Sequence, residues 1–311
     1  MRLAVLHRCI RRTKESRMNY AHLQKPQLSY RYEFELDEAE AAQACVEAHG
    51  FAILKHVLPP AMVEALKTSV MQVVNPNNDL GPGQSRTHTY FIEESPAMWQ
   101  LLDFEPYMRA QRIFCQAEEL TVNRSAAIIR NPGSPALVWH SDWRGFSAEP
   151  PKTANDVLNR GPWPSGLWFY LTGSNPAHGG LAVIEDSHLP DWPGPEGFEL
   201  TPDKTSFYPK GGEPKGYTGF DIPGLVPLFT APGDEIIFAH RTYHSAFPNR
   251  SDQVRLSCAI GFRARTEHID APWPRSASAQ RFVDALPAHL QPLVENYVGI
   301  DPQWRRNEMM G

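Results

Sequence analysis

The pattern of hydrophobic and polar positions changes near residue 120. Before that point apolar residues recur at helical spacing, which predicts a helical N-terminal part over 37–120. Asp37 and Glu40 suit a helix start, Gly50 suits a helix end, and Pro59-Pro60 suits the first turn of a second helix. The expected elements are a helix over 37–50, a strand over 50–54, a helix over 59–74 and a helical region over 96–120.

After residue 120 the apolar runs become short and rich in β-branched residues, and Pro, Gly and Asn separate them. Many short strands with such turns are typical of a sandwich or jelly roll and not of a parallel α/β sheet. A helical pattern over 278–298 closes the chain. The expected strands are 121–130, 136–140, 166–172, 180–184, 226–230, 234–238 and 254–263.

Two stretches, 145–165 and 190–225, fit no regular element and are rich in proline, the second also in glycine. Long insertions of this kind in a compact β domain act as lids or binding loops, or are passive loops. The sequence favours the lid interpretation without excluding the passive one.

Composition narrows the class of protein. The chain has 311 residues and a formal net charge of −5, so it carries no basic field that would attract nucleic acid. No apolar run reaches the roughly 20 residues that a membrane span needs. Residues 1–20 are basic but lack an apolar stretch with a cleavage site, so we expect a disordered arm, or a true start at Met18, and not a secretory signal.

The cysteines lie far apart, without a CxxC pair, and this spacing fits a reducing compartment better than a disulfide framework. We therefore expect a cytoplasmic protein, and the sequence carries no signal for an oligomeric state. The four residues are Cys9, Cys45, Cys115 and Cys258.

The first candidate metal ligands lie in Trp139-His140-Ser141-Asp142, at the end of a predicted strand; this segment is called the metal run below. Residues two apart on a strand point to the same side, so His140 and Asp142 can meet one metal ion. The H-x-D pattern alone is weak, because His268 and Asp270 repeat it beyond the last predicted strand. We expect His268 to be a surface or capping residue.

A third ligand must come from a distant strand, and the candidates are His178, His188, His240 and His244. His178 lies in a turn and His188 at a strand exit, where structural hydrogen bonds are more common. Arg255, at the head of an apolar strand after a turn, favours His244, because the turn lets both side chains line one cavity. A buried guanidinium needs an anionic partner, and its planar fork suits a carboxylate. The alternative is a structural ion pair of Arg255 with Asp252 or Asp234.

These residues resemble the phytanoyl-CoA dioxygenase family over roughly residues 45–265. The likeness rests on His140-Ser-Asp142, on Gly179-Gly180-Leu-Ala-Val-Ile-Glu-Asp-Ser-His188, and on His244-Ser-Ala-Phe-Pro-Asn-Arg-Ser-Asp-Gln-Val-Arg255. The resemblance implies a double-stranded β-helix (jelly-roll, cupin-like) core at about 121–265 with flanking helices, in a single domain over 21–311. It also implies Fe(II), 2-oxoglutarate and O2 as cofactor and cosubstrates.

By the same resemblance, His140, Asp142 and His244 match the iron ligands, and Arg255 matches the residue that holds the distal carboxylate of 2-oxoglutarate. Trp168 resembles a cosubstrate-site tryptophan of some members, although a plain core tryptophan is an equal alternative. The sequence departs from the common pattern of the family at two places. Ala246 replaces a serine that often binds the same carboxylate, and Glu185-Asp186 replaces a common Pro-Gly.

The implied activity is an oxygenase that hydroxylates a small molecule and releases succinate and CO2. Two alternatives remain, a non-catalytic jelly-roll binding protein and a zinc-dependent hydrolase. Aromatic residues near the metal run (Trp143, Phe146 and Trp163) suit an apolar or ring-bearing substrate or simple loop packing. A CoA thioester would want clustered cations, whereas the insertions hold only Arg144, Lys152, Arg160, Lys204, Lys210 and Lys215.

Overall fold

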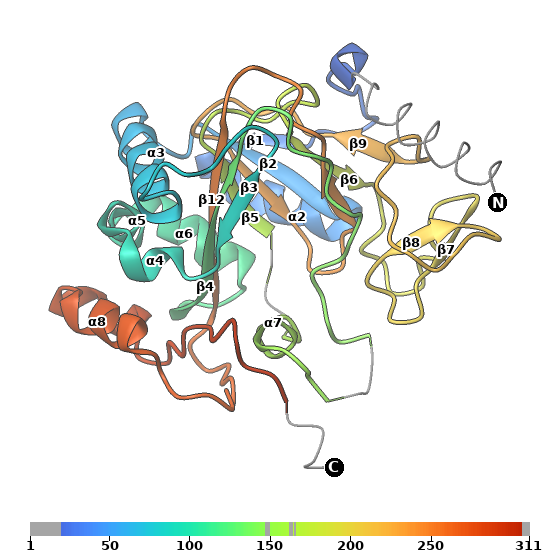
Figure 1. Ribbon diagram of the computed structural model, residues 1–311. Helices are drawn as coiled ribbons and strands as arrows, with labels where there is room; N and C mark the ends of the chain where they lie inside the picture. Colours follow the sequence, from blue (N-terminus) through green and yellow to red (C-terminus); the bar gives the residue numbers. More distant parts are fainter. Residues whose placement is uncertain (1–19, 147–149, 162–163, 165, 307–311) are drawn as a thin grey trace.

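The computed structural model describes residues 20–146, 150–161, 164 and 166–306 (Figure 1). The seven-stranded main sheet has the order β1-β2-β10-β5-β12-β4-β3. Its strands are β1 (Glu33–Glu35), β2 (Phe51–Lys55), β3 (Ser85–His88), β4 (Leu120–Arg130), β5 (Gly166–Tyr170), β10 (Glu235–Phe238) and β12 (Arg255–Ala264).

A smaller sheet has the order β11-β6-β9, and a separate hairpin pairs β7 with β8. Val183 and Val226 of the smaller sheet pack into the same hydrophobic core as Ile236 of the main sheet. Two sheets that share a core form the predicted jelly roll. The strands are β6 (Leu181–Ile184), β7 (Phe198–Leu200), β8 (Phe207–Pro209), β9 (Leu225–Pro227) and β11 (His244–Ala246).

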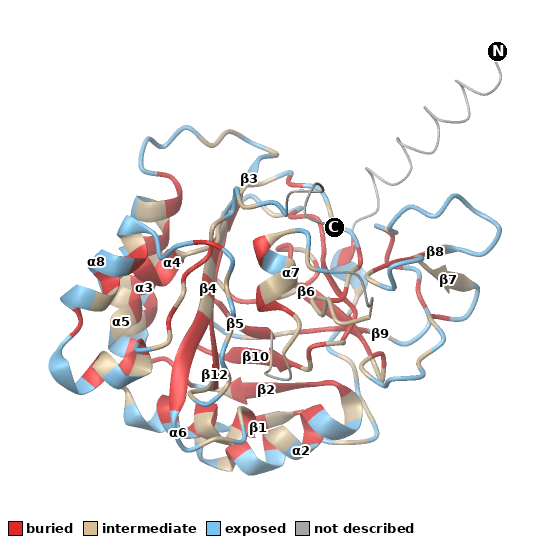
Figure 2. Cartoon of the chain, turned by 90° about the horizontal axis from the view of Figure 1, so that it is seen from below, coloured by how far each residue is buried: buried red, intermediate tan, exposed pale blue. Residues whose placement is uncertain are grey.

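Helices cover the outer face of the main sheet, and Figure 2 shows their exposed sides turned away from the buried strands. Within the described residues no helix has the length and apolar character that a membrane crossing requires. The helices are α2 (Ala39–His49), α3 (Pro60–Val74), α4 (Phe91–Glu94), α5 (Pro96–Leu102), α6 (Glu105–Phe114), α7 (Ala154–Leu158) and α8 (Ala277–Ala285), with 3-10 turns at Tyr20–His22, Leu36–Glu38 and Ala288–Leu293.

The two faces of the main sheet differ in character. The outer face of β12 buries Leu256, Cys258 and Ile260 under the helices. On β4 the burial alternates with a period of two, so that Arg124, Ala126 and Ile128 on the inner face are only half-buried. The inner face therefore borders an accessible space within the jelly roll.

Several local predictions were wrong. The expected helical region 96–120 is confirmed up to Phe114, as two helices separated at Asp103 and Phe104, but residues 115–120 are not helical. The capping box joins Glu35 and Glu38 instead of Asp37 and Glu40. The C-terminal helix ends at Ala285, because Pro287 cannot continue it.

The segment 136–140 is not a strand, since within it only His140 pairs, in an isolated bridge to His244. Both insertions also contain regular structure: α7 lies in 145–165 and the β7–β8 hairpin in 190–225. The strands β1, β3, β7, β8 and β11 were not predicted. The basic arm falls almost wholly outside the described residues.

Candidate metal centre

Backbone pairing brings the two histidines of the predicted triad together. His140 and His244 exchange two backbone hydrogen bonds, of 3.0 and 2.9 Å, and their ring centroids lie 4.3 Å apart. Asp142 reaches the same point, with an oxygen 3.8 Å from Nε2 of His140 and another 4.0 Å from Nε2 of His244. Metal–N and metal–O bonds of about 2.0–2.2 Å would place donors of one ion at comparable separations.

Each imidazole is oriented by the backbone carbonyl two residues before it. Nδ1 of His140 lies 2.8 Å from the Val138 carbonyl, and Nδ1 of His244 lies 3.0 Å from the Thr242 carbonyl. A carbonyl oxygen only accepts hydrogen bonds, so each Nδ1 carries the proton and each Nε2 offers a lone pair to the centre. The two rings are thus held in the tautomer that binds a metal.

The electrostatics favour a bound cation. Burial acts to raise the pKa of Asp142, but His244, the Arg124 guanidinium and further basic groups outweigh it and hold that pKa below its usual value. Nη2 of Arg124 lies 3.4 Å from the Asp142 carboxylate. Burial lowers the pKa of His244 to about 4. An ionised carboxylate and a neutral imidazole are the forms that ligate metals.

The other candidate histidines lie outside this group. His178 bonds Ser251 at 2.7 Å and Thr172 at 3.1 Å, and His188 donates to the Glu47 carbonyl at 3.0 Å. His240 is buried, burial lowers its pKa to about 3, and its carbonyl accepts from Ser141 Oγ at 3.3 Å. His268 is exposed, as is Asp270.

Arg255 is only 1% exposed and does not pair with a carboxylate among the described residues. It donates to the Gly179 carbonyl at 3.0 Å and to Ser257 Oγ at 3.3 Å. Asp234, one of its two possible ion-pair partners, bonds Lys55 instead. Trp168 is half-buried and pairs with Ala259 of β12, so its side chain lies on the same inner face as Arg255.

The second insertion supports the metal run. Ser141 N–H donates to the Thr205 carbonyl at 2.9 Å, and Trp139 N–H donates to the Tyr217 carbonyl at 2.8 Å. The indole of Trp139 donates to the Gly219 carbonyl at 2.8 Å. A stretch that the sequence suggested as a lid therefore contains the scaffold of the segment that carries His140. The sequence offered no signal for this role.

Aromatic and basic residues close to the start of the first insertion also pack together. Trp143 and Phe146 contact each other at 4.7 Å, and the Arg241 guanidinium lies 3.9 Å above the Trp143 ring. Trp163 lies outside the described residues. A pocket of about 550 Å³ between the two insertions gathers four of the six basic residues noted above, together with two acids: Arg144, Lys152, Arg160, Lys204, Asp156 and Asp203.

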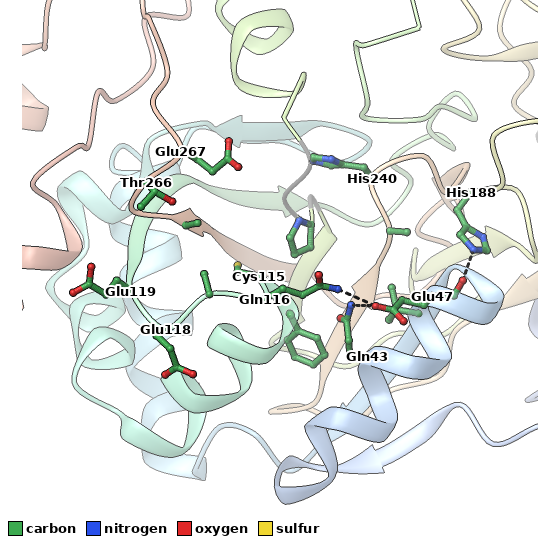
Figure 3. Close-up of a pocket in the computed structure, with 16 residues that line it drawn as sticks. Gln43, Glu47, Cys115, Gln116, Glu118, Glu119, His188, His240, Thr266 and Glu267 are labelled. Carbon is green, nitrogen blue, oxygen red and sulfur yellow. Dashed lines mark hydrogen bonds between the residues drawn. The ribbon is translucent and has the colours of Figure 1, made fainter.

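A larger pocket, of about 860 Å³, opens between α2, α6 and the ends of β10 and β12 (Figure 3). None of the three triad residues lines it, but His240 does, and the His240 backbone touches Ser141. Glu47 accepts hydrogen bonds from Gln43 and Gln116, both 2.9 Å long, as the dashed lines show. Among the residues that the structure describes, the wall holds four glutamates and no lysine or arginine: Glu47, Glu118, Glu119 and Glu267.

The acids that replace the common Pro-Gly form a second, more exposed group. His49, Glu185 and Asp186 bring their side chains together, with 3.6 Å between His49 Nδ1 and an Asp186 oxygen. Tyr30 stacks on His49 with a centroid distance of 3.4 Å. Asp186 has a φ of 58°, in the left-handed region that glycine tolerates best.

Solved structures share this fold. The non-haem α-ketoglutarate-dependent carbocyclase SnoK from nogalamycin biosynthesis is 18% identical, with a TM-score of 0.52 over 72% of this chain and 83% of that one. HygX from Streptomyces hygroscopicus, solved with nickel, 2-oxoglutarate and hygromycin B, is 16% identical, with a TM-score of 0.52 over 75% and 91%. The epimerase SnoN, solved with Fe3+, α-ketoglutarate and nogalamycin RO, is 18% identical, with a TM-score of 0.52 over 88% and 96%. A comparison with curated proteins finds no significant match.

A family model for phytanoyl-CoA dioxygenase (PhyH) matches residues 46–257, which is more than half of the chain. The match includes the triad residues and Arg255, and it confirms the resemblance noted from the motifs. The chain therefore belongs to the phytanoyl-CoA dioxygenase family of iron- and 2-oxoglutarate-dependent oxygenases.

Proposed function

We propose that His140, Asp142 and His244 hold the Fe(II) of this oxygenase and that Arg255 binds the distal carboxylate of 2-oxoglutarate. The observation that supports this most is the convergence of two Nε2 lone pairs and one carboxylate within 4.8 Å of one another. Two histidines and one carboxylate are the ligand set of non-haem Fe(II) oxygenases, and they leave positions open on the metal. We also propose that residues 21–311 form a single domain.

When bound, iron and 2-oxoglutarate supply the oxidising chemistry, in which O2 is consumed and succinate and CO2 are released. The chain supplies orientation and charge. The carbonyls of Val138 and Thr242 fix the two imidazoles, and Arg124 holds the Asp142 carboxylate. Trp168 and Ile128, both half-buried on the inner face, would give the cosubstrate site apolar walls. Because such walls cannot pair with a carboxylate, the distal carboxylate of 2-oxoglutarate would need Arg255 as its cationic partner.

We further propose that a small-molecule substrate approaches through the pocket of Figure 3. Four glutamates line it and Arg265 pairs with one of them, Glu119, at 2.7 Å, so the wall keeps a negative character. It would repel a polyanion such as a CoA thioester, and a neutral or cationic substrate fits better. In the smaller pocket two acids offset part of the charge of the four basic residues, as in the 3.5 Å contact between Arg144 and Asp156. Hygromycin B and nogalamycin RO in the related structures agree with a small-molecule substrate.

The cytoplasm remains our proposed compartment. Cys45, Cys115 and Cys258 are all free thiols in the structure, as a reducing environment would keep them.

One titration separates this function from its two alternatives. Anaerobic addition of Fe(II) and then 2-oxoglutarate should produce a weak visible charge-transfer band, and O2 should then release succinate. The band should be absent in His244→Ala. A zinc hydrolase would show neither signal, and a non-catalytic binding protein could show the band but would release no succinate. Absence of both signals from the wild type would refute the proposal.

A further inference from the structure

Arg130 and Arg255 lie side by side at one end of the jelly roll. They are directly opposed Cα partners on β4 and β12, so their side chains emerge on the same face of the main sheet. That is the inner face, which also carries Arg124 and Trp168. Each arginine is only 1% exposed. Two like charges therefore share one buried location.

The described residues leave both guanidinium groups incompletely satisfied. Arg130 donates to the Pro135 carbonyl, but its Nε and Nη1 have no partner, and Nε of Arg255 has none either. Neither forms an ion pair with a described acid. Burial and the neighbouring Arg255 lower the pKa of Arg130 to about 9. An unpaired buried charge is expensive, and a second like charge increases the cost.

Arg263, further along β12, is a buried arginine whose hydrogen bonds are made within the protein. It is also 1% exposed, yet its three nitrogens donate to the carbonyls of Glu267, Val122 and Asn296 at 2.8, 3.3 and 2.7 Å. Burial without an acid is thus compatible with full hydrogen bonding in this chain. The open N–H groups of Arg130 and Arg255 indicate a ligand that is an anion.

Strand β11 has no side-chain hydrogen-bond donor at residue 246, where alanine stands. His244 and Ala246 are two residues apart on that strand, so the methyl group of Ala246 faces the same interior as the His244 ring. A serine there would have offered a hydroxyl to the cosubstrate carboxylate, and alanine offers nothing. A second cation can replace that hydrogen bond.

We propose that Arg130 and Arg255 together clamp the distal carboxylate of 2-oxoglutarate and that Arg130 makes the pocket selective for dicarboxylic 2-oxo acids. This inference rests on the proposed function, because it assumes that Arg255 faces the cosubstrate. It adds a second cosubstrate-binding residue. A pocket with two cations discriminates strongly against 2-oxo acids that end in a methyl group, since these would leave both charges unpaired.

The test compares Arg130→Met with Arg130→Lys and uses Arg263→Met as the matched control. Anaerobic titration of the Fe(II) protein with 2-oxoglutarate gives the affinity, and succinate release gives KM and kcat. Arg130→Met should weaken 2-oxoglutarate binding about tenfold or more and raise KM accordingly, with kcat at saturation changed much less. Arg130→Lys should recover part of the loss, and binding of pyruvate should not weaken.

Thermal unfolding without iron or cosubstrate supplies a second readout that does not depend on activity. Arg130→Met should melt at the wild-type temperature or above it, because it removes an unpaired buried charge. Arg263→Met should melt lower, because it leaves three carbonyls without their donors.

The outcomes are distinguishable. A wild type that does not bind 2-oxoglutarate refutes the proposed function and this inference with it. A wild type that binds, together with an Arg130→Met variant of equal affinity, refutes only the clamp. Arg130 would be structural if three results came together. Arg130→Met would fail to fold, Arg130→Lys would bind 2-oxoglutarate with wild-type affinity, and any folded variant would lose equal affinity for pyruvate and 2-oxoglutarate.

Discussion

The imidazoles of His140 and His244 owe their orientation to carbonyls only two residues earlier, at Val138 and Thr242. Such contacts form as soon as each segment is extended, so the donor atoms are oriented before any metal arrives. Only the meeting of the two segments, through the His140–His244 bridge, requires the tertiary fold. The metal site is therefore expected to be preorganised in the protein without iron.

His140→Ala or His244→Ala should abolish iron retention and 2-oxoglutarate turnover, because two remaining ligands hold Fe(II) poorly. His240→Ala is the matched control, since this residue is buried close to the triad but is not part of it. Metal content after gel filtration is measured for all three variants and should stay near the wild-type value in His240→Ala, and succinate release is measured for the two ligand variants. Iron lost in His240→Ala and kept in His244→Ala would reverse the assignment of the distal ligand.

Glu235 predicts a dependence of stability on pH. It is fully buried on β10, and burial raises its pKa to about 8, although hydrogen bonds from Tyr107 and Gln111 act to lower it. A carboxyl whose pKa is raised by folding stabilises the fold fully below its unfolded pKa, and this contribution is lost as the pH rises through about 8.

Glu235→Gln stays neutral at every pH, so its melting temperature should rise relative to the wild type between about pH 5 and pH 9. The measurement is the difference in melting temperature between the two proteins across that range. A difference that stays constant with pH would show that Glu235 is ionised in the folded protein.

At the scale of elements, the β7–β8 hairpin and the segment after it act as a support for the metal run. Phe207 of β8 is fully buried, with ring centroids 6.0 Å from Trp139 and 5.9 Å from Tyr243. These residues form an aromatic cluster that is separate from the main core. Damage to the cluster should therefore reach His140 through its neighbour Trp139.

Phe207→Ala should destabilise the protein by about 3–5 kcal/mol or melt the insertion locally. It should also weaken iron binding, although Phe207 is far from the ligands in sequence. Phe262→Ala, equally buried but in the main core, is the control for a general loss of stability. Both variants are compared by iron affinity well below their melting temperatures. Equal iron affinities would show that the hairpin does not support the site.

At the scale of the whole molecule, the main core joins the helices to the outer face of the large sheet and contains none of the triad residues. Folding should therefore not require the metal. Asp142 lies near His244 of β11 in the smaller sheet and near Arg124 of β4 in the main sheet, so a bound ion and cosubstrate would connect parts of the chain that are distant in sequence.

Fe(II) with 2-oxoglutarate, added without oxygen, should raise the melting temperature, and a chelator should return it to the value of a still-folded protein. A ligand at a hundred times its dissociation constant adds about 2.7 kcal/mol of stability. Differential scanning calorimetry measures both states, and His244→Ala should show no shift. A chelated protein without a cooperative transition would mean that the metal is needed for folding.

The sequence by itself determined the class of the fold and the family, and it singled out His140 and Asp142 because they are two residues apart, although the strand expected there did not form. Gly50 ended the first helix where expected, because its φ of 88° is a conformation that glycine adopts without strain. That His244 and Arg255 line one cavity stays a prediction from the sequence, based on the turn between them in one short stretch of chain. Such features depend on neighbours in sequence.

Only the tertiary structure decided which distant residues meet. Arg130 attracted no attention in the sequence, and the register of β4 against β12 is what sets it beside Arg255. The support of Trp139 by the second insertion, and the gathering of glutamates around the pocket of Figure 3, also arise between segments far apart in the chain. Register and long-range packing follow from the burial of whole faces at once, and no local pattern of residues encodes them.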